Sequence, residues 1–129
     1  MTGINWVAWG AATLSCFVLG GIWYGPLFGR AWMALVGISE QAIQQANMAK
    51  IYGTTFVLQA AAAFMLAQAM GPDAHWLLGL HWGLMAGVWV AIAFGVGYLF
   101  EQRPFKLWAI NAGYNLCSFA VMGTILGAW

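Results

Sequence analysis

The side chains that could do chemistry in this sequence are amides, hydroxyls and one histidine, all placed within long apolar runs. Asn111 and Asn115 are four residues apart, so on a helix they share a face, with Tyr114 and Ser118 beside them. Because an unpaired amide is costly in hydrocarbon, we expect both amides to point inward and to hydrogen-bond across helices. The chemistry this predicts is the binding of a polar solute, a lipid headgroup or an ion.

Other polar side chains fall at a similar depth when each apolar run is counted at about 1.5 Å per residue. Ser15, Gln59 and Asn115 lie near the middle of their runs, and His81 lies roughly 9 Å below the outer surface. The predicted intramembrane pocket therefore consists of Asn111, Asn115, Tyr114, Gln59, His81, Ser15 and Ser118. The simpler interpretation is that these side chains only tie helices together, at about 0.6–2 kcal/mol per bond.

His81 offers a second chemistry, the ligation of haem or a pigment. Trp82 and Gly83 follow it and Trp89 lies further along the same run, where a flat macrocycle could stack. His75 lies about 120° away round a helix and cannot share the ligand. The alternative is a histidine bonded to a neighbouring helix, so we otherwise predict no cofactor and no metal site.

Several function classes receive no support from the residue patterns. The sequence contains no GxSxG or HExxH motif and no paired carboxylates, so we do not expect an enzyme. The long apolar runs hold no Asp, Glu, Lys or Arg, which disfavours a proton-coupled pump. Four basic residues and a net charge of +1 cannot neutralise a phosphate backbone, so nucleic acid is excluded as a partner.

The elements that must position these side chains are membrane-spanning helices. The 129 residues are 64% hydrophobic and 5% charged, too few charges to cover a water-soluble domain. At about 1.5 Å per residue, four uncharged runs can each cross a hydrocarbon layer of about 30 Å. These predicted spans are 4–25, 51–70, 74–100 and 107–129. We therefore predict an all-α integral membrane protein, a single domain over residues 1–129 folded as a compact four-helix bundle.

The connection between the first two spans has its own local signals. Gly25 and Pro26 predict the end of the first helix, because proline has no amide hydrogen to donate. Residues 30–37 are amphipathic and predict a short segment along the interface. Ser39 predicts the N-cap of a helix that begins in water at Glu40 and continues into the second span.

All four basic residues lie in the connections that follow the first and third spans. These predicted cytoplasmic anchors are Arg30, Lys50, Arg103 and Lys106. By the positive-inside rule, both connections face the cytoplasm and both termini face outward. We expect a bacterial inner, or plasma, membrane.

Small residues recur at four-residue spacing and form ridges along three helices. The predicted helix-packing residues are Gly79, Gly83, Gly87, Gly123, Gly127, Ala12 and Gly20. Their simplest role is to pack the protein's own bundle, with membrane lipid around it. Because the ridges exceed what a thin bundle needs, we also expect a homo-oligomer, with a dimer as the first expectation. An alternative is an accessory or assembly subunit that docks these ridges on a larger membrane complex.

Two motifs give the chain a family resemblance. WYGPLFGRAW lies in the first connection and LWAINAGY opens the last span. With their flanking residues they resemble the two ends of domain-of-unknown-function family 1761, small membrane proteins of bacteria and fungi. The resemblance covers nearly the whole chain and implies a four-span fold without indicating an activity. The leading hypothesis is thus a protein that binds or passes a small polar molecule or lipid through its intramembrane pocket.

Overall fold

The structure, a computed structural model, describes residues 5–71 and 74–129, and its regular elements there are all helices. The long helices are α1 (Trp6–Ile22), α4 (Met48–Met70), α5 (Trp76–Phe100) and α6 (Phe105–Ala128). Three short elements join α1 to α4, namely the π-helical turn η1 (Trp23–Leu27), α2 (Gly29–Val36) and α3 (Glu40–Gln45). α1 with η1, α4, α5 and α6 are each long and apolar enough to cross a membrane, which confirms the predicted all-α, four-span class.

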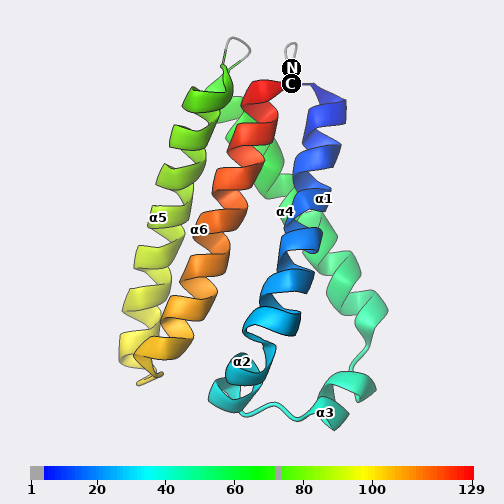
Figure 1. The fold of residues 1–129 in the computed structure, drawn as a ribbon, viewed down its shortest axis with the longest axis vertical. Coiled ribbons are helices and arrows are strands. Elements are labelled where there is room, and N and C mark those ends of the chain that lie inside the picture. Colours follow the sequence, from blue (N-terminus) through cyan, green and yellow to red (C-terminus); the bar gives the residue numbers. More distant parts are fainter. Residues whose placement is uncertain (1–4, 72–73) are drawn as a thin grey trace.

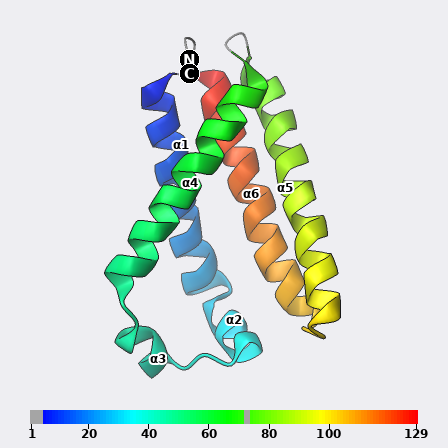
Figure 2. The same ribbon diagram turned by 180° about the vertical axis from the view of Figure 1, so that it is seen from behind.

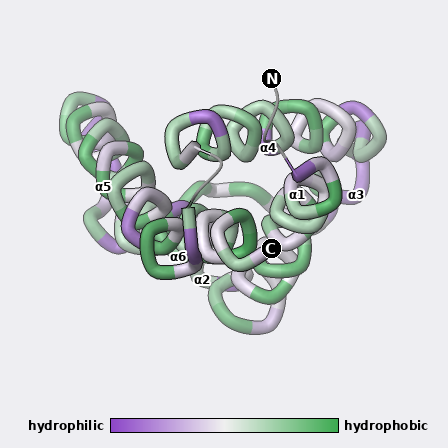
Figure 3. The backbone as a smooth tube through the Cα atoms, turned by 90° about the horizontal axis from the view of Figure 1, so that it is seen from above, coloured by the Kyte–Doolittle hydropathy of each residue, from purple (hydrophilic) through white to green (hydrophobic). Residues whose placement is uncertain are grey.

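The four long helices run alternately up and down (Figure 1). The start of α1, the end of α4, the start of α5 and the end of α6 lie at one end of the molecule. At the other end lie α2, α3 and the α5–α6 connection, and with them the segments that carry all four basic residues. Hydrophobic residues cover most of each long helix (Figure 3), as expected for helices surrounded by lipid. The membrane in which the protein resides and the side that each end faces stay predictions.

α5 and α6 pack closely because glycines on each helix face the backbone of the other. These glycines are Gly79, Gly83 and Gly87 on α5, and Gly123 and Gly127 on α6. A Cβ atom added to Gly79 would meet the carbonyl oxygen of Gly123, and one added to Gly83 would meet that of Phe119. The ridges predicted on these two helices therefore pack against each other within one chain. A second copy or a larger complex has to use a different surface.

The opposite side of the bundle is held by α1. Ala12 and Cys16 are fully buried in a core shared with α4 and α6, and Gly20 lies against the Tyr114 ring. The indole of Trp9 donates a hydrogen bond of 2.9 Å to the carbonyl oxygen of Ala60 on α4. From this crossing, α4 diverges from α5 and α6 towards the end that carries α2 and α3 (Figure 2).

The first helix does not end at Gly25 and Pro26, so that prediction was wrong. The chain continues through η1 with Pro26 inside it, and the amide of Phe28 donates to the carbonyl of Trp23 at 2.8 Å. A π-helical turn is wider than an α-helical turn and accommodates a residue that lacks an amide hydrogen. The turn also directs Trp23 and Tyr24 towards α6, where both donate hydrogen bonds.

The helix predicted to run from Glu40 into the second span is broken, so its continuity was also wrong. The Ser39 hydroxyl caps α3 as expected, but this helix ends at Gln45. The Asn47 side chain then caps α4 by accepting a hydrogen bond of 3.1 Å from the Lys50 amide. An Asx N-cap of this kind starts a helix in a new direction, which allows α4 to enter the bundle separately from α3.

Candidate functional site

A cleft of about 800 Å³ lies between α4 on one side and α1, α5 and α6 on the other. We call it the aromatic cleft, because its sixteen lining residues include all four tyrosines of the chain, Tyr24, Tyr52, Tyr98 and Tyr114. None of the lining residues is an Asp, Glu, Lys, Arg or His. The cleft is thus uncharged, and it combines ring faces with hydroxyl and amide groups.

Asn111 on α6 is held on both sides by tyrosines from other elements. The Tyr24 hydroxyl donates to Asn111 Oδ1 at 2.7 Å, and Asn111 Nδ2 donates to the Tyr98 hydroxyl oxygen at 2.8 Å. All three side chains are partly buried. The hydrogen bonds run in one direction and end at Tyr98, whose own hydroxyl hydrogen meets no acceptor among the described residues.

Two further amides face the cleft with open hydrogen-bonding groups. Asn115 Nδ2 donates to the backbone oxygen of Asn111 at 2.9 Å, and its Oδ1 accepts from no group in the described chain. Gln59 lines the cleft from α4, and no described residue hydrogen-bonds to its side chain. Both are partly buried within spans. They offer donors and acceptors to a molecule in the cleft.

The aromatic rings pack against one another and so have fixed positions. The Tyr24 ring lies edge-on to Tyr114 at 5.3 Å and to Trp32 of α2 at 5.5 Å between centroids. Phe94 and Tyr98 on α5 are parallel, with centroids 5.8 Å apart. Edge-on and offset-parallel contacts are the favourable geometries for aromatic rings. The walls of the cleft are therefore preformed.

The structure brings four of the seven predicted pocket residues to the cleft: Asn111, Asn115, Tyr114 and Gln59. The two serines lie outside it. The Ser15 hydroxyl donates to the carbonyl of Ala12 in its own helix at 2.6 Å. The buried Ser118 hydroxyl donates to Cys16 Sγ at 3.0 Å and ties α6 to α1.

His81 also lies outside the cleft, on the exposed side of α5. It precedes Gly83 by two residues, which is about 200° round a helix. Because Gly83 faces the backbone of α6, His81 must face away from the bundle. The contact with α6 also occupies the space at Gly83 where a macrocycle was expected to stack. Haem or pigment binding at His81 stays a prediction that is separate from the aromatic cleft.

The sequence analysis missed Tyr24, Tyr98 and Trp32 as cleft residues. Depth alone did not identify them, because Tyr24 and Tyr98 lie near the ends of spans and Trp32 lies on the short helix α2, and all three are typical of interfacial aromatic residues. A usable signal was present: Tyr24 and Tyr98 each close a span, immediately before a connection that contains an arginine. Matching positions at two helix ends indicate that both side chains could reach one site.

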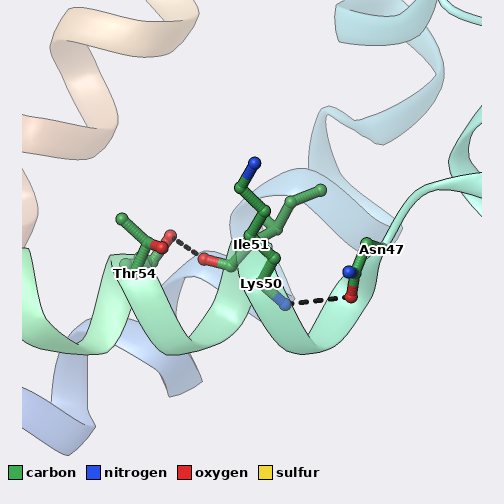
Figure 4. A pocket seen from close by; sticks show the side chains of 5 residues that line it. Asn47, Lys50, Ile51 and Thr54 are labelled. Carbon is green, nitrogen blue, oxygen red and sulfur yellow. Dashed lines mark hydrogen bonds between the residues drawn. The ribbon is translucent and has the colours of Figure 1, made fainter.

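A smaller groove lies over the first turns of α4 (Figure 4), lined by Asn47, Lys50, Ile51, Thr54 and Thr55. Its polar groups largely serve the helix itself. The Asn47 side chain caps it, and the Thr55 hydroxyl donates to the Ile51 carbonyl at 2.7 Å. Since Ile51 and Thr55 also line the aromatic cleft, the groove places the exposed Lys50 close to the rim of that cleft.

Four membrane-spanning helices around an uncharged aromatic cleft define a small multi-pass membrane protein. Within that class, the chain belongs to the family described as "Protein of unknown function (DUF1761)", whose model matches residues 7–127. The match confirms the resemblance and includes every residue that lines the cleft. No curated protein and no solved structure matches the chain.

Proposed function

We propose that the protein binds a small polar molecule, or the polar head of a lipid, in the aromatic cleft and holds or passes it within the membrane. The observation that supports this most directly is the pair of open amides. Asn115 and Gln59 face one cleft from α6 and α4 with hydrogen-bonding groups that no described residue satisfies.

The energetic argument starts from the cost of such amides. In hydrocarbon, an amide without a partner costs several kcal/mol, so polar side chains at this depth mark either helix contacts or a ligand pathway. Asn111 serves helix contacts through its two tyrosines, whereas Gln59 does not. A volume of about 800 Å³ also lies within the usual range for small-molecule sites.

The test compares variants that remove one amide each. The chain is purified from its native membrane in mild detergent, and native mass spectrometry reports any small molecule retained. We expect the wild-type protein to retain one, and Asn115→Leu and Gln59→Leu to lose it.

Thr124→Val is the matched control, because Thr124 lies on α6 outside the aromatic cleft and its hydroxyl donates to Ala120 of the same helix at 2.8 Å. It should retain the molecule like the wild type. Equal retention by all variants, or a wild-type protein that carries nothing, would contradict the proposal.

A further inference from the structure

We infer that the ligand is an uncharged, lipid-soluble ring that carries carbonyl acceptors, the chemistry of a quinone head, and that it enters sideways from the bilayer between α4 and the α5–α6 pair. This inference rests on the proposed function, because it names the class of ligand for the same cleft.

The sideways route follows from how α4 is held. The C-terminal half of α4 is anchored, since Leu66 and Met70 belong to the shared core. The N-terminal half of α4 is largely exposed. Its aromatic rings pack on α1, where the ring centroid of Phe56 lies 6.1 Å from that of Phe17. No hydrogen bond joins residues 51–59 of α4 to the described parts of α5 or α6. The cleft is therefore open towards the lipid between the N-terminal half of α4 and the α5–α6 pair.

The charges around the cleft select an uncharged head. The Arg103 guanidinium lies 5.3 Å from the centre of the Tyr98 ring, so a cation already occupies that aromatic face. All four basic residues also lie at this end of the molecule. Arg103 is paired with Glu101 at 2.9 Å, and the remaining excess of positive charge repels a cationic head. An anionic head would be buried with no opposite charge among the lining residues.

Depth and hydrogen bonding then favour carbonyls over hydroxyls. A sugar-like head would have to release water from many hydroxyls to reach Gln59 and Asn115, and the cleft has few polar groups to replace that water. A carbonyl ring needs only donors, and it has no donor of its own to desolvate. The cleft supplies donors from the Tyr98 hydroxyl, from the Gln59 amide and from the second Nδ2 hydrogen of Asn115, whose first hydrogen bonds the Asn111 carbonyl.

The shape of the lining fits a flat ring with a tail. The fixed rings of Tyr24 and Phe94 offer a face or an edge on which a planar head can stack. A volume of about 800 Å³ holds one such ring together with the first part of an apolar chain. The rest of the chain would remain in the bilayer.

The experiment uses the full chain in mild detergent and four compounds with the same decyl tail. Their heads are a benzoquinone, a maltoside, a trimethylammonium and a phosphate. Only the quinone should raise the midpoint of thermal unfolding, by roughly 10 °C at a hundredfold excess over its Kd. Gln59→Leu should weaken quinone binding about tenfold, because one hydrogen bond to the ligand is lost.

Tyr98→Phe keeps the ring and removes the terminal donor, so it should also weaken quinone binding. Thr124→Val should bind the quinone like the wild type. A shift of equal size in all these variants would mean that the quinone only partitions into the detergent, and the inference would fall. Stabilisation by maltoside, lost in Asn115→Leu, would overturn the carbonyl ring but keep the proposed function. If no compound stabilises a protein that still retains a native small molecule, the quinone is likewise wrong. No stabilisation and no retained molecule would overturn both.

Discussion

Replacing Gly83 by alanine should push α5 and α6 apart. The added Cβ would lie 2.8 Å from the carbonyl carbon of Phe119 and 3.0 Å from the Cα of Ala120. Carbon atoms in good contact are about 3.5–4.0 Å apart, so the helices must separate by roughly 0.7–1 Å at this level. The neighbouring atoms belong to backbone, which cannot rotate out of the way.

The expected cost follows from that separation. A gap of about 0.5–1 Å forfeits a quarter to a half of each dispersion contact, and overpacking typically costs about 1–3 kcal/mol. Alanine in place of glycine within a helix raises the free energy of unfolding by about 0.5–1 kcal/mol, because it restricts the unfolded backbone. The free energy of unfolding should therefore fall by about 1–2 kcal/mol.

Gly10→Ala is the matched control, since a Cβ added to Gly10 of α1 meets nothing within 4 Å. It keeps the helix-propensity gain without the clash, so its stability should be unchanged or higher. Reversible unfolding in mixed detergent micelles, followed by the loss of helical circular dichroism, measures both variants. If Gly83→Ala proves as stable as Gly10→Ala, the close glycine contact between α5 and α6 is refuted.

Three further outcomes can be measured, two argued from the structure and one from the sequence. Asn111→Leu removes the hydrogen bonds to Tyr24 and Tyr98 and should lower the free energy of unfolding by about 1–3 kcal/mol, more than Asn115→Leu does; an equal effect in the same unfolding assay would show that the two tyrosines do not depend on Asn111. Cysteines placed one at a time at Arg30 and Arg103 should react with a membrane-impermeant reagent from the same side; labelling from opposite sides would contradict the arrangement in Figure 1. Native mass spectrometry should show a homo-oligomer, and a monomer at high protein concentration would end that expectation.

The position of Asn111 shows how far sequence reasoning reaches into the candidate site. The four-residue spacing to Asn115 predicts a shared face of one helix, and depth counting places Gln59 at a similar level. Both inferences use only the geometry of a single helix. Which partner each amide meets depends on the rotation of a second helix, so the hydrogen bond from Tyr24 could not be derived from the sequence.

His81 and Ser118 show where the same sequence reasoning failed. Both have the depth expected of a pocket residue, yet His81 faces outward and Ser118 is buried against Cys16. Depth depends on the distance along one helix axis, whereas facing depends on the angle around it. That angle was set by Gly79, Gly83 and Gly87, whose lack of a side chain lets α5 approach α6 closely.

The sequence by itself determined that lipid surrounds this protein and that the chain crosses the membrane four times. The lengths of the apolar runs and the positions of four basic residues are local properties, and transfer into lipid depends on them alone. Only the tertiary structure decided that four tyrosines from four helical segments line one cleft, and that the N-terminal half of α4 lies apart from α5 and α6. Those features depend on crossing angles between helices, which arise from contacts between residues far apart in the chain.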